Sequence, residues 1–596
     1  MNILGLSFGH DGTACVVKNG ILAAAISTER ITREKKARGV NKKTIKYVLD
    51  KAGVKFDDID MVSVSNWFWD RGSEGAELFD KTTDEFSVTN ENGIELSEQD
   101  YATLMQNTGM VAQGVYTFSV GDQTKPCFFL DHHFSHCAYS YFMSPYTDGA
   151  SLSIDFADNI GASHAVYYFN DENTLFRPLR RGGDFAVGSY YGQICDFLGF
   201  YPSLTDAGKV MALAAYGEPN KGYKDFSWPN VVQNGDLFHG DMYVHTLSRS
   251  GIKNFPDQRV FFPQLKGEGG TAYPEWLDKK DWKKTSHQTI AATAQSVLEE
   301  SIYNLVEKIY KSFGNVTENI TLAGGTNLNC VSNGKLLNSE LFKNVFLAPA
   351  AGDDGLCIGG ALFLSTQLGK NKEGVAERRL SHKKMHSVKQ TFEGGRSYSE
   401  AEISEAIEKS SVDAVKLSDK DVVDKVVDHI DNGKVIGWFQ GGSELGPRAL
   451  GHRSILGDAR SRDMKNTLNN KVKHREEFRP FAPVVTYEES NKWFELNGKA
   501  SPFMLYSVKC KQPKVIPSGV HIDDTARVQT VTREDNERFY DLVKEFGEKT
   551  GVPVIINTSF NVQGEPIVET PSDAIKCFLG TDIDVLVLEN FIIEKK

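Results

Sequence analysis

The sequence predicts an α/β protein with a duplicated N-terminal domain and a separate C-terminal α/β domain, and three observations lead to this prediction. A chain of 596 residues, of which 40% are hydrophobic, is longer than a domain with a single hydrophobic core usually is, so more than one domain is expected. Short apolar runs separated by glycine turns occur at the N-terminus and again near position 150. A polar, basic stretch at 366–389 has the composition of a linker, so we place one domain at 1–365 and another at 390–596.

The N-terminal repeat begins with three expected strands, at residues 3–7, 14–17 and 21–26. Asn19-Gly20 lies between the second and third runs and is a strong hairpin signal, because both residue types tolerate positive φ. The turn Gly9-His10-Asp11-Gly12 joins the first two runs, and its glycines let backbone N–H groups approach an anion closely.

A second copy follows the same plan, with expected strands at 150–156 and 164–169 and a turn at 158–161. Two strand-turn-strand units whose polar turns face each other across a cleft are typical of the actin-like fold of ATPases and sugar kinases. The turns of that fold hold nucleotide phosphates. Asp11 and Gly12 are therefore candidate nucleotide-binding residues.

A double glycine, Gly324-Gly325, follows an apolar run at 319–323 and leads into a helix-like segment with Asn329. Such a junction commonly holds a nucleotide base or ribose. A simple turn is the competing interpretation. The position of the junction, after two phosphate-type hairpins, favours the nucleotide.

A metal site is predicted by His132 and His136, whose i, i+4 spacing places both imidazoles on one helical face. Asp155, at the end of an expected strand, could add a carboxylate, and such a mixed set suits iron, manganese or zinc better than calcium. The acidic turn 352–355 before a buried helix could deliver one more carboxylate. The competing interpretation is that Asp131 caps a helix and the histidines are packed or solvated.

Residues 448–479 contain nine Lys or Arg against four Asp or Glu, opposite to the charge balance of the whole chain. A solvated helical face is the common cause of such a run, and RNA binding is another, although aromatic residues for base stacking are sparse. The basic residues alternate with turn residues, which fits a lined pocket. Because arginine suits phosphate and carboxylate oxygens, we expect a small phosphorylated ligand.

Composition narrows the class of protein further. With 67 Lys plus Arg against 79 Asp plus Glu, the net charge is −12, which argues against nucleic acid or an anionic membrane as a partner. The eight cysteines include no C-x-x-C pair, and neither a signal peptide nor a membrane-spanning run is evident. We expect a cytoplasmic enzyme.

Taken together, the motifs resemble the O-carbamoyltransferases of the NodU/CmcH type, which modify nodulation factors, cephalosporins and other natural products. The resemblance covers nearly the whole chain. Its motifs are Gly9-His10-Asp11, Thr28-Glu29-Arg30, the His132/His136 pair, residues 208–217, Gly324-Gly325, residues 446–455, 475–483 and 526–531, Asn557-Thr558-Ser559-Phe560-Asn561 and Gly564-Glu565-Pro566-Ile567.

The resemblance implies an enzyme with two sites. The N-terminal actin-like domain is similar to the universal tRNA threonylcarbamoyl-transfer protein, and the C-terminal YrdC-like domain is similar to threonylcarbamoyl-adenylate synthases. The C-terminal domain would convert carbamoyl phosphate and ATP into carbamoyl adenylate. The N-terminal domain would transfer the carbamoyl group to a hydroxyl of a small natural product, with release of AMP.

The resemblance also implies residue roles. His10 is the expected catalytic base. The expected ligands of Fe(II), or of another divalent transition metal, are His132, His136, Asp155 and Asp353. The expected nucleotide-binding residues of the N-terminal domain are Asp11, Gly12, Lys209, Gly324, Gly325 and Asn329. The residues expected to bind carbamoyl phosphate and ATP, with Mg²⁺, are Arg448, Lys473, Arg479, Arg527, Thr530, Asn557 and Ser559.

Some points stay open at this stage. Gly161 comes late in the turn after Asp155, which puts the usual phosphate contact of that turn in doubt. The register of Lys471 against Lys473 is undecided, and the insertion at about 68–120 carries no motif. A tRNA-modifying threonylcarbamoyl-type transferase, an actin-fold sugar kinase and a non-catalytic ATP-dependent protein remain alternatives. The acceptor is not identified, and a homodimer is the default expectation.

Overall fold

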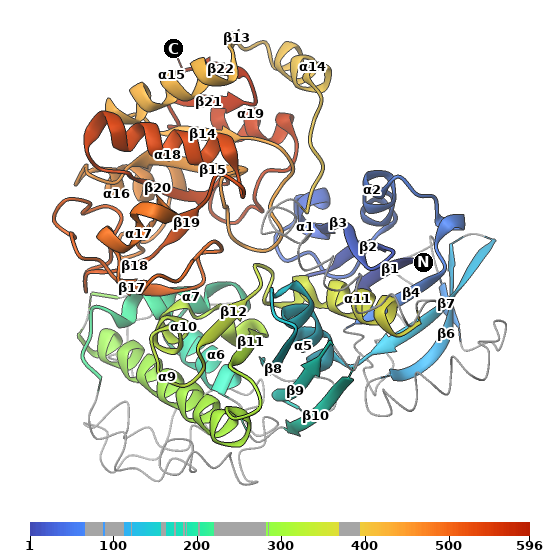
Figure 1. Ribbon diagram of the computed structural model, residues 1–596. Helices are drawn as coiled ribbons and strands as arrows, with labels where there is room; N and C mark the ends of the chain where they lie inside the picture. Colours follow the sequence, from blue (N-terminus) through green and yellow to red (C-terminus); the bar gives the residue numbers. More distant parts are fainter. Residues whose placement is uncertain are drawn as a thin grey trace.

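The computed structural model describes most of the chain. The described residues are 1–65, 87–89, 112–120, 122–155, 162–171, 175–182, 185, 187–200, 203–219, 282–283, 285–368 and 394–595. Three bodies are visible in Figure 1: a first sheet in blue, a second sheet in teal and green, and a C-terminal unit in orange and red.

The first sheet has seven strands in the order β3-β2-β1-β4-β7-β6-β5. Its strands are β1 (Asn2–Ser7), β2 (Thr13–Lys18), β3 (Ile21–Ser27), β4 (Met61–Ser65), β5 (Ser87–Thr89), β6 (Ala112–Val120) and β7 (Gln123–Leu130). β1, β2 and β3 pair antiparallel, whereas β4 joins β1 and β7 in parallel. Asn19 (φ 51°) and Gly20 (φ 84°) form the hairpin between β2 and β3, as predicted.

The second sheet has five strands in the order β10-β9-β8-β11-β12. Its strands are β8 (Asp148–Ile154), β9 (His164–Asn170), β10 (Leu175–Gly182), β11 (Asn319–Ala323) and β12 (Asn344–Leu347). β8, β9 and β10 pair antiparallel, and β11 pairs in parallel with both β8 and β12. The strand order and strand directions of this second sheet repeat those of β3-β2-β1-β4-β7 in the first sheet. The predicted duplication is therefore confirmed. The turn expected at 158–161 lies outside the described residues.

Two helices fill the space between the sheets. α5 (His132–Met143) packs on β8, β9 and β11, and α11 (Leu356–Leu368) packs on β1, β2 and β4. The two helices also pack on each other, with Gly359 of α11 so close to α5 that a Cβ would lie 2.1 Å from the carbonyl oxygen of Ser135. The N-terminal end of α5 and the turn before α11 therefore meet between the two sheets.

Further helices cover the outer faces. On the first sheet they are α1 (Thr28–Thr32), α2 (Lys42–Ala52) and the short 3₁₀ helix Phe56–Asp58. On the second they are α6 (Val187–Phe197), α7 (Ser203–Ala214), α9 (Thr285–Phe313) and α10 (Cys330–Leu337), with the 3₁₀ turn Gly325–Leu328 before α10. The 3₁₀ turn Asp353–Gly355 contacts α5 and α11 between the two sheets. The junction after Gly324-Gly325 is thus a 3₁₀ turn, and a helix follows it.

The C-terminal unit is built on an eight-stranded mixed sheet in the order β13-β22-β21-β14-β15-β20-β16-β19. The strands are β13 (Val415–Lys416), β14 (Ile436–Phe439), β15 (Arg453–Asp458), β16 (Ala482–Thr486), β19 (Gln529–Val531), β20 (Val554–Ser559), β21 (Val585–Leu588) and β22 (Phe591–Glu594), with a separate pair β17 (Ser507–Lys509) and β18 (Thr525–Arg527). The helices are α14 (Glu400–Ser410), α15 (Asp419–Asp431), α16 (Met464–Thr467), α17 (Tyr487–Trp493), α18 (Glu537–Thr550) and α19 (Pro571–Leu579), with a π-helical turn at Leu468–Lys473. The helices and strands predicted after the linker are present.

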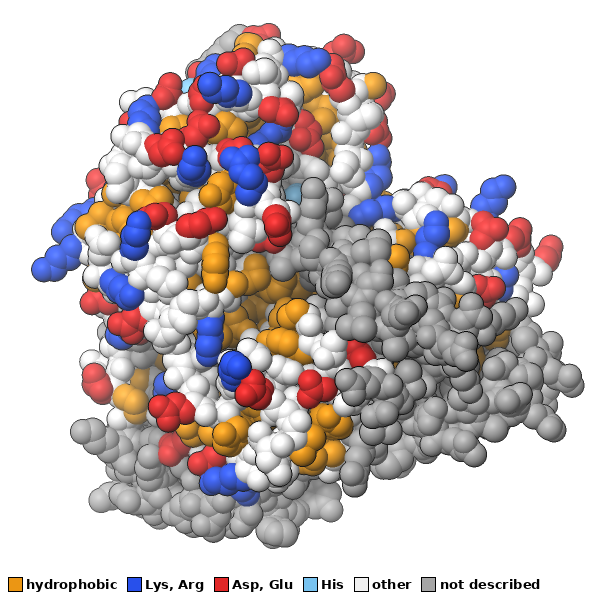
Figure 2. All heavy atoms as spheres, viewed as in Figure 1, with side chains coloured by type: hydrophobic (Ala, Val, Ile, Leu, Met, Phe, Trp, Pro, Cys, Tyr) orange, Lys and Arg blue, Asp and Glu red, His pale blue; other side chains and the backbone are white. Residues whose placement is uncertain are grey.

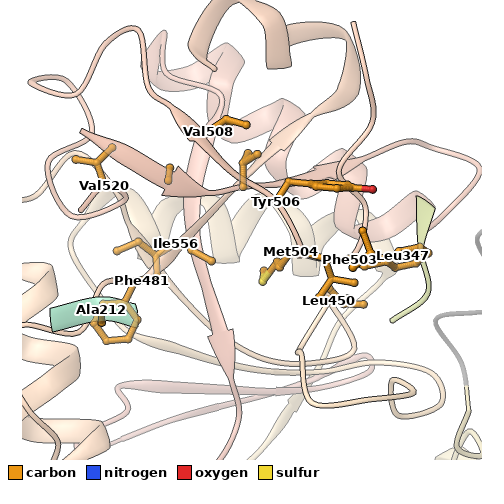
Figure 3. Close-up of a cluster of buried hydrophobic side chains, with 14 of the residues drawn as sticks. Ala212, Leu347, Leu450, Phe481, Phe503, Met504, Tyr506, Val508, Val520 and Ile556 are labelled. Atoms are coloured by element: carbon orange, nitrogen blue, oxygen red, sulfur yellow. The ribbon is translucent and has the colours of Figure 1, made fainter. Parts of the chain in front are cut away.

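The C-terminal unit shares a hydrophobic cluster with the second sheet. Figure 3 shows Ala212 of α7 beside Phe481, and Leu347 of β12 beside Phe503, and all four belong to one buried cluster. Burial of apolar side chains is the main favourable term in such an association. The C-terminal unit is therefore fixed against the N-terminal half of the protein.

Residues 366–368, the start of the expected linker, are helical, because α11 continues to Leu368. The remainder of the linker lies outside the described residues. Of the insertion at 68–120, β5 and β6 extend the first sheet.

No helix among the described residues has the length and apolar character to cross a bilayer. On the face in Figure 2, acidic and basic side chains are interspersed over the C-terminal unit.

Candidate functional site

The N-terminal end of α5 presents two histidines toward the space between the sheets. Asp131 caps this helix, because its Oδ1 accepts a hydrogen bond from the backbone N–H of Phe134 at 2.7 Å. His132 and His136 lie one turn apart, with ring centroids 4.7 Å apart. The two interpretations of this segment are therefore compatible: the aspartate caps the helix and the histidines share a face.

Two carboxylates complete the cluster. Oδ2 of Asp155, just after β8, lies 2.9 Å from Nε2 of His136 and 3.5 Å from Nε2 of His132. Oδ1 of Asp353, in the turn before α11, lies 3.4 Å and 3.9 Å from the same nitrogens. One ligand atom from each residue lies within 4.8 Å of the other three, so these four side chains can hold one metal ion.

Burial and hydrogen bonding both fit a cation at this position. His136 is fully buried and Asp353 is 5% exposed. Among the described residues, neither ring nitrogen of His132 has a hydrogen-bond partner. A buried polar atom without a partner is costly, and a metal ion would use such atoms as ligands.

The electrostatics of the cluster are those of mutually stabilised charges. Burial lowers the pKa of His136, but the hydrogen bonds and charges of Asp155 and Asp353 raise it overall to about 9. Burial raises the pKa of Asp155, yet the two histidines hold it well below its usual range. The carboxylates and the His136 imidazole thus stabilise each other's charged forms.

His10 lies beside this cluster. Its Nδ1 is 3.1 Å from Oδ2 of Asp353 and 3.7 Å from Oδ2 of Asp11. Burial lowers the pKa of His10, but the charge and hydrogen bond of Asp353 raise it overall to about 9. The predicted base and the predicted metal ligands therefore share a carboxylate, with one oxygen of Asp353 facing each.

Two further charged residues lie at this site: Lys36, which was not predicted, and Asp354, which was predicted only as part of the acidic turn 352–355. Nζ of Lys36 lies 2.6 Å from Oδ2 of Asp11, and Lys36 has a left-handed backbone with φ 58°. Asp354 follows Asp353, and burial, with the charge of Asp11, raises its pKa to about 7. The run of basic residues after Thr28-Glu29-Arg30 was the only sign of Lys36 in the sequence.

His133, between the two cluster histidines in sequence, points to other partners. Its Nδ1 lies 2.9 Å from Oγ of Ser153, and its Nε2 lies 2.9 Å from the carbonyl oxygen of Ala162. Burial holds its pKa well below the usual value. A lowered pKa favours the neutral form of His133, and its two hydrogen bonds connect α5 to Ser153 of β8 and to Ala162.

The glycine junction lies against the metal cluster. Gly324 has φ +91°, and a Cβ there would lie 2.1 Å from the carbonyl oxygen of Ile154. The backbone N–H of Gly325 donates to Oδ2 of Asp155 at 3.2 Å. Gly12 is equally confined, because a Cβ there would lie 1.6 Å from the carbonyl oxygen of Gly39.

Two other residues expected to bind nucleotide have protein partners. Asn329 caps α10 by accepting a hydrogen bond from Ser332, and its Nδ2 donates to Oε1 of Gln295 at 2.9 Å. Lys209 forms an ion pair with Glu476 of the C-terminal unit, with Nζ and Oε1 2.9 Å apart. Their expected contacts with nucleotide stay predictions.

A second group of polar residues lies in the C-terminal unit. Lys473 ends the π-helical turn, which is an uncommon conformation that often marks functional sites. Its Nζ donates to the backbone carbonyls of Ser559 and Asn561 and, at 2.8 Å, to Oδ1 of Asn561. The side chain of Lys471 lies outside what the structure describes, so the choice of Lys473 over Lys471 stays a prediction.

Four arginines crowd the same region, namely Arg448, Arg475, Arg479 and Arg527. Burial, followed by the charge of Arg527, lowers the pKa of Arg448 to about 9. Burial and the neighbouring Arg479 also lower the pKa of Arg475, which was not predicted as a site residue. Nε of Arg448 and Nε of Arg527 have no hydrogen-bond partner among the described residues. Clustered guanidinium groups of this kind suit an anion.

Thr530 and Asn557, which were also expected to bind the phosphorylated ligand, have protein partners. Oγ1 of Thr530 accepts a hydrogen bond from the backbone N–H of Ser501 at 2.9 Å. Nδ2 of Asn557 donates to Oε1 of Gln529 at 2.7 Å and to the carbonyl oxygen of Ala449 at 3.2 Å. Asn557 thereby supports the backbone next to Arg448.

Comparisons with known proteins give relatives along the full length. An uncharacterized protein of Synechocystis is 32% identical over all of this chain and 97% of that protein. Nodulation protein NolNO of Sinorhizobium fredii is 30% identical over 99% of this chain and 80% of its own length. The 3'-hydroxymethylcephem-O-carbamoyltransferase of Streptomyces clavuligerus is 26% identical over 77% of this chain and 78% of its own.

Among solved structures, the activator of 2-hydroxyisocaproyl-CoA dehydratase from Clostridium difficile covers 65% of this chain at 12% identity and a TM-score of 0.31. HypF from T. kodakarensis covers 61% of this chain at 12% identity and a TM-score of 0.27. The duplicated architecture is established by the sheet order described above and not by these scores.

The family models account for most of the sequence. Residues 2–362 match the model described as Carbamoyltransferase N-terminus, and residues 427–595 match the model described as Carbamoyltransferase C-terminus. The chain therefore belongs to the carbamoyltransferase family, with relatives of the NodU and 3'-hydroxymethylcephem-O-carbamoyltransferase type.

Proposed function

We propose that this protein is an ATP-dependent O-carbamoyltransferase with two sites. In a YrdC-like C-terminal domain at 390–596, water cleaves carbamoyl phosphate to carbamate and phosphate, and the carbamate attacks the α-phosphate of ATP to give carbamoyl adenylate and pyrophosphate. The carbamoyl group is then transferred to an acceptor hydroxyl in an actin-like domain at 1–365. The observation that carries this proposal is a His/Asp cluster in the N-terminal half together with a cluster of basic residues in the C-terminal unit, in a chain of the carbamoyltransferase family. The basic cluster, proposed to be a ligand pocket and called the basic pocket below, consists of Arg448, Lys473, Arg475, Arg479 and Arg527.

The basic pocket supports the activation half of the proposal. Carbamoyl phosphate and ATP are both anions, and guanidinium groups bind phosphate and carbamoyl oxygens through directed, charge-assisted hydrogen bonds. Arg448, Arg479 and Arg527 are the proposed ligands of these oxygens. Lys473 donates hydrogen bonds to the backbone of Ser559 and Asn561, so its proposed role is to position Ser559 for the nucleotide.

The His/Asp cluster supports the transfer half. His132, His136, Asp155 and Asp353 would hold Fe(II) or another divalent transition metal, because their nitrogen and oxygen donors suit such ions. A bound cation supplies positive charge that polarises the carbamoyl oxygen or orients the phosphate. ATP would carry Mg²⁺ as its usual counter-ion.

His10 is the proposed base for the acceptor hydroxyl. Asp353 holds the Nδ1 side of the ring, so the Nε2 side is the one offered to the acceptor. A general base must be neutral when it accepts a proton, and Asp353 raises the pKa of His10. A cation held by the other oxygen of Asp353 would weaken the attraction between Asp353 and His10, and so would lower the pKa of His10. The function of His10 therefore depends on the neighbouring cluster.

The acceptor is proposed to be a hydroxyl-bearing small molecule. A relative named for O-carbamoyl transfer to a hydroxymethylcephem points to this class. We further propose a cytoplasmic location, no nucleic-acid or membrane partner, and a homodimer as the working oligomeric state.

The test is pyrophosphate and AMP formation from ATP by the purified full-length chain. Pyrophosphate release that requires carbamoyl phosphate supports the activation step. AMP release that rises with added hydroxyl acceptors, together with a carbamoyl mass increment on one of them, supports transfer. ADP formation with a sugar instead would indicate a kinase, and carbamoyl transfer only to tRNA would indicate the tRNA-modifying alternative. Either result would refute the proposal.

A further inference from the structure

The turn that carries Arg448 is held from the other half of the protein. Gly446 has φ +91°, and its carbonyl oxygen accepts a hydrogen bond from Nη2 of Arg30 at 3.1 Å, in a buried position. On the same glycine, a Cβ would lie 2.6 Å from the carbonyl oxygen of Pro349. The turn Gly446-Pro447-Arg448 thus contacts α1 and the segment that leads to Asp353 through Gly446.

Within the C-terminal unit, a single carboxylate holds the other side of this turn. Oε1 of Glu444 accepts backbone N–H hydrogen bonds from Leu450 and His452 at 2.8 Å and from Arg453 at 2.9 Å. These hydrogen bonds close a loop of residues 444–450, and Arg448 is one of the residues of that loop. Because all three donors are backbone groups, these hydrogen bonds do not depend on the side chains of Leu450, His452 and Arg453.

Arg30 and Glu444 are complementary in charge and burial. Arg30 is 4% exposed and Glu444 is 3% exposed. Burial raises the pKa of Glu444, but His452, the backbone hydrogen bonds and Arg30 keep it below the usual value. A buried charge without compensation is strongly destabilising, and Arg30 is one of the groups that compensate the buried carboxylate of Glu444.

Two more cations of the N-terminal half contact loops of the basic pocket. Arg33 donates from Nη1 to the carbonyl oxygen of Ile567 at 2.7 Å and from Nη2 to that of Pro566 at 3.0 Å. Lys209 pairs with Glu476, whose Oε2 lies 3.6 Å from Nη1 of Arg479. Arg30 is the one of these three that reaches the Arg448 turn.

We propose that Arg30, together with Glu444, is a positioning residue for carbamoyl phosphate: from the N-terminal half of the chain it fixes the Gly446-Pro447-Arg448 turn so that the Arg448 guanidinium faces the anion. This inference rests on the proposed function, because it assigns a residue outside the C-terminal unit to the activation step. It makes the activation pocket incomplete without the N-terminal half.

The experiment measures carbamoyl-phosphate-dependent pyrophosphate release in full-length variants. Arg30→Met removes the cross-domain hydrogen bond, and the expected result is a KM for carbamoyl phosphate at least about tenfold higher, as for loss of one hydrogen bond to a charged group. Arg30→Lys keeps the charge but not the planar fork, so an intermediate KM is expected. If Arg30→Met does not fold, the KM of Arg30→Lys for carbamoyl phosphate tests the proposal, and an unchanged KM would overturn it.

Lys51→Met is the matched control. Lys51 also crosses between the two halves, with its Nζ 2.7 Å from the carbonyl oxygen of Gly394, but its contact is not on the Arg448 turn. It should leave the KM for carbamoyl phosphate unchanged. An equal rise of KM in Lys51→Met would show a general effect of domain docking and would overturn the proposal.

A double-mutant cycle separates positioning from mere stability. If Arg30 acts through Arg448, then Arg30→Met should add no further loss in an Arg448→Ala background. Additive losses, or an unchanged KM in folded Arg30→Met, would overturn the positioning role and leave the proposed function intact. If the wild-type protein releases no pyrophosphate with carbamoyl phosphate, the proposed function fails first, and the inference falls with it.

Discussion

His136 and Asp155 stand 19 residues apart in sequence, yet Nε2 of the imidazole and Oδ2 of the carboxylate lie 2.9 Å apart. The helix α5 carries the histidine into the space between the two sheets, and β8 ends at the same place. Asp353 reaches this point from the turn before α11. The strands and helices that repeat in the two halves thus bring three distant segments to one cluster.

Replacing His136 by Ala should remove the metal from this cluster. One ligand of four is lost, and even changes to groups that only support a ligand commonly weaken metal affinity by about 10- to 100-fold. Metal content of the purified variant, measured by mass spectrometry against protein concentration, should fall together with acceptor carbamoylation.

His133→Gln is the control for this change. His133 is on the same helix and equally buried, but its nitrogens face Ser153 and Ala162. The folded variant should retain metal. Full metal occupancy in His136→Ala, or equal loss in both variants, would contradict the assignment of His136 as a ligand.

Lys473→Met should impair the activation step more than Lys471→Met. The Lys473 ammonium holds the backbone of Ser559 and Asn561, and burial lowers its pKa well below the usual range. Loss of such charge-assisted contacts typically costs about 1.5 to 3 kcal/mol, so the KM for ATP or carbamoyl phosphate should rise roughly tenfold or more. Equal pyrophosphate-release kinetics for the two variants would refute the preference for Lys473.

Stability toward acid should depend on Glu444. Its pKa is lower in the folded protein than in the unfolded chain, so its contribution to the free energy of unfolding is complete at neutral pH. That contribution is lost as the pH falls below the ordinary pKa of glutamate and through the lower folded value. Glu444→Gln should therefore have a lower Tm than the wild type at pH 7, and the difference should shrink on acidification. Thermal melts at a series of pH values measure this, and a constant difference would disprove it.

Much of the fold follows from local patterns in the sequence. The Asn19-Gly20 hairpin, the strand before Gly324 and the α14 and α15 helices depend on turn chemistry and periodicity, which act within a few residues. Capping residues add to this, since Ser399 and Glu402 close a capping box at the start of α14. The order of the strands in each sheet depends on long-range pairing, so only the duplication itself could be predicted.

The candidate site divides in the same way. The spacing of His132 and His136 is a local signal, and it predicted a shared face. No spacing relates Asp353 to that pair, because their meeting depends on the packing of α11 against α5. Arg30 and Glu444 were missed as a pair for the same reason: their hydrogen bonds converge on one loop, and they are separated by most of the chain.

The division of labour between the two sites gives the last prediction. His10 lies beside Asp353 in the N-terminal half, whereas Arg527 lies among the arginines of the basic pocket. His10→Ala should still release pyrophosphate from ATP and carbamoyl phosphate but fail to carbamoylate the acceptor. Arg527→Ala should weaken pyrophosphate release by roughly ten- to a hundredfold, because it loses a charge-assisted hydrogen bond.

Supplying the intermediate distinguishes the two variants. Carbamoyl adenylate prepared separately should restore product formation by Arg527→Ala and should not restore it in His10→Ala, because only the transfer step needs the imidazole. Product is measured by mass spectrometry with the same acceptor in both cases. If folded His10→Ala lost pyrophosphate release as well, the two centres would act as one composite site, and the assignment of activation to the C-terminal unit alone would be wrong.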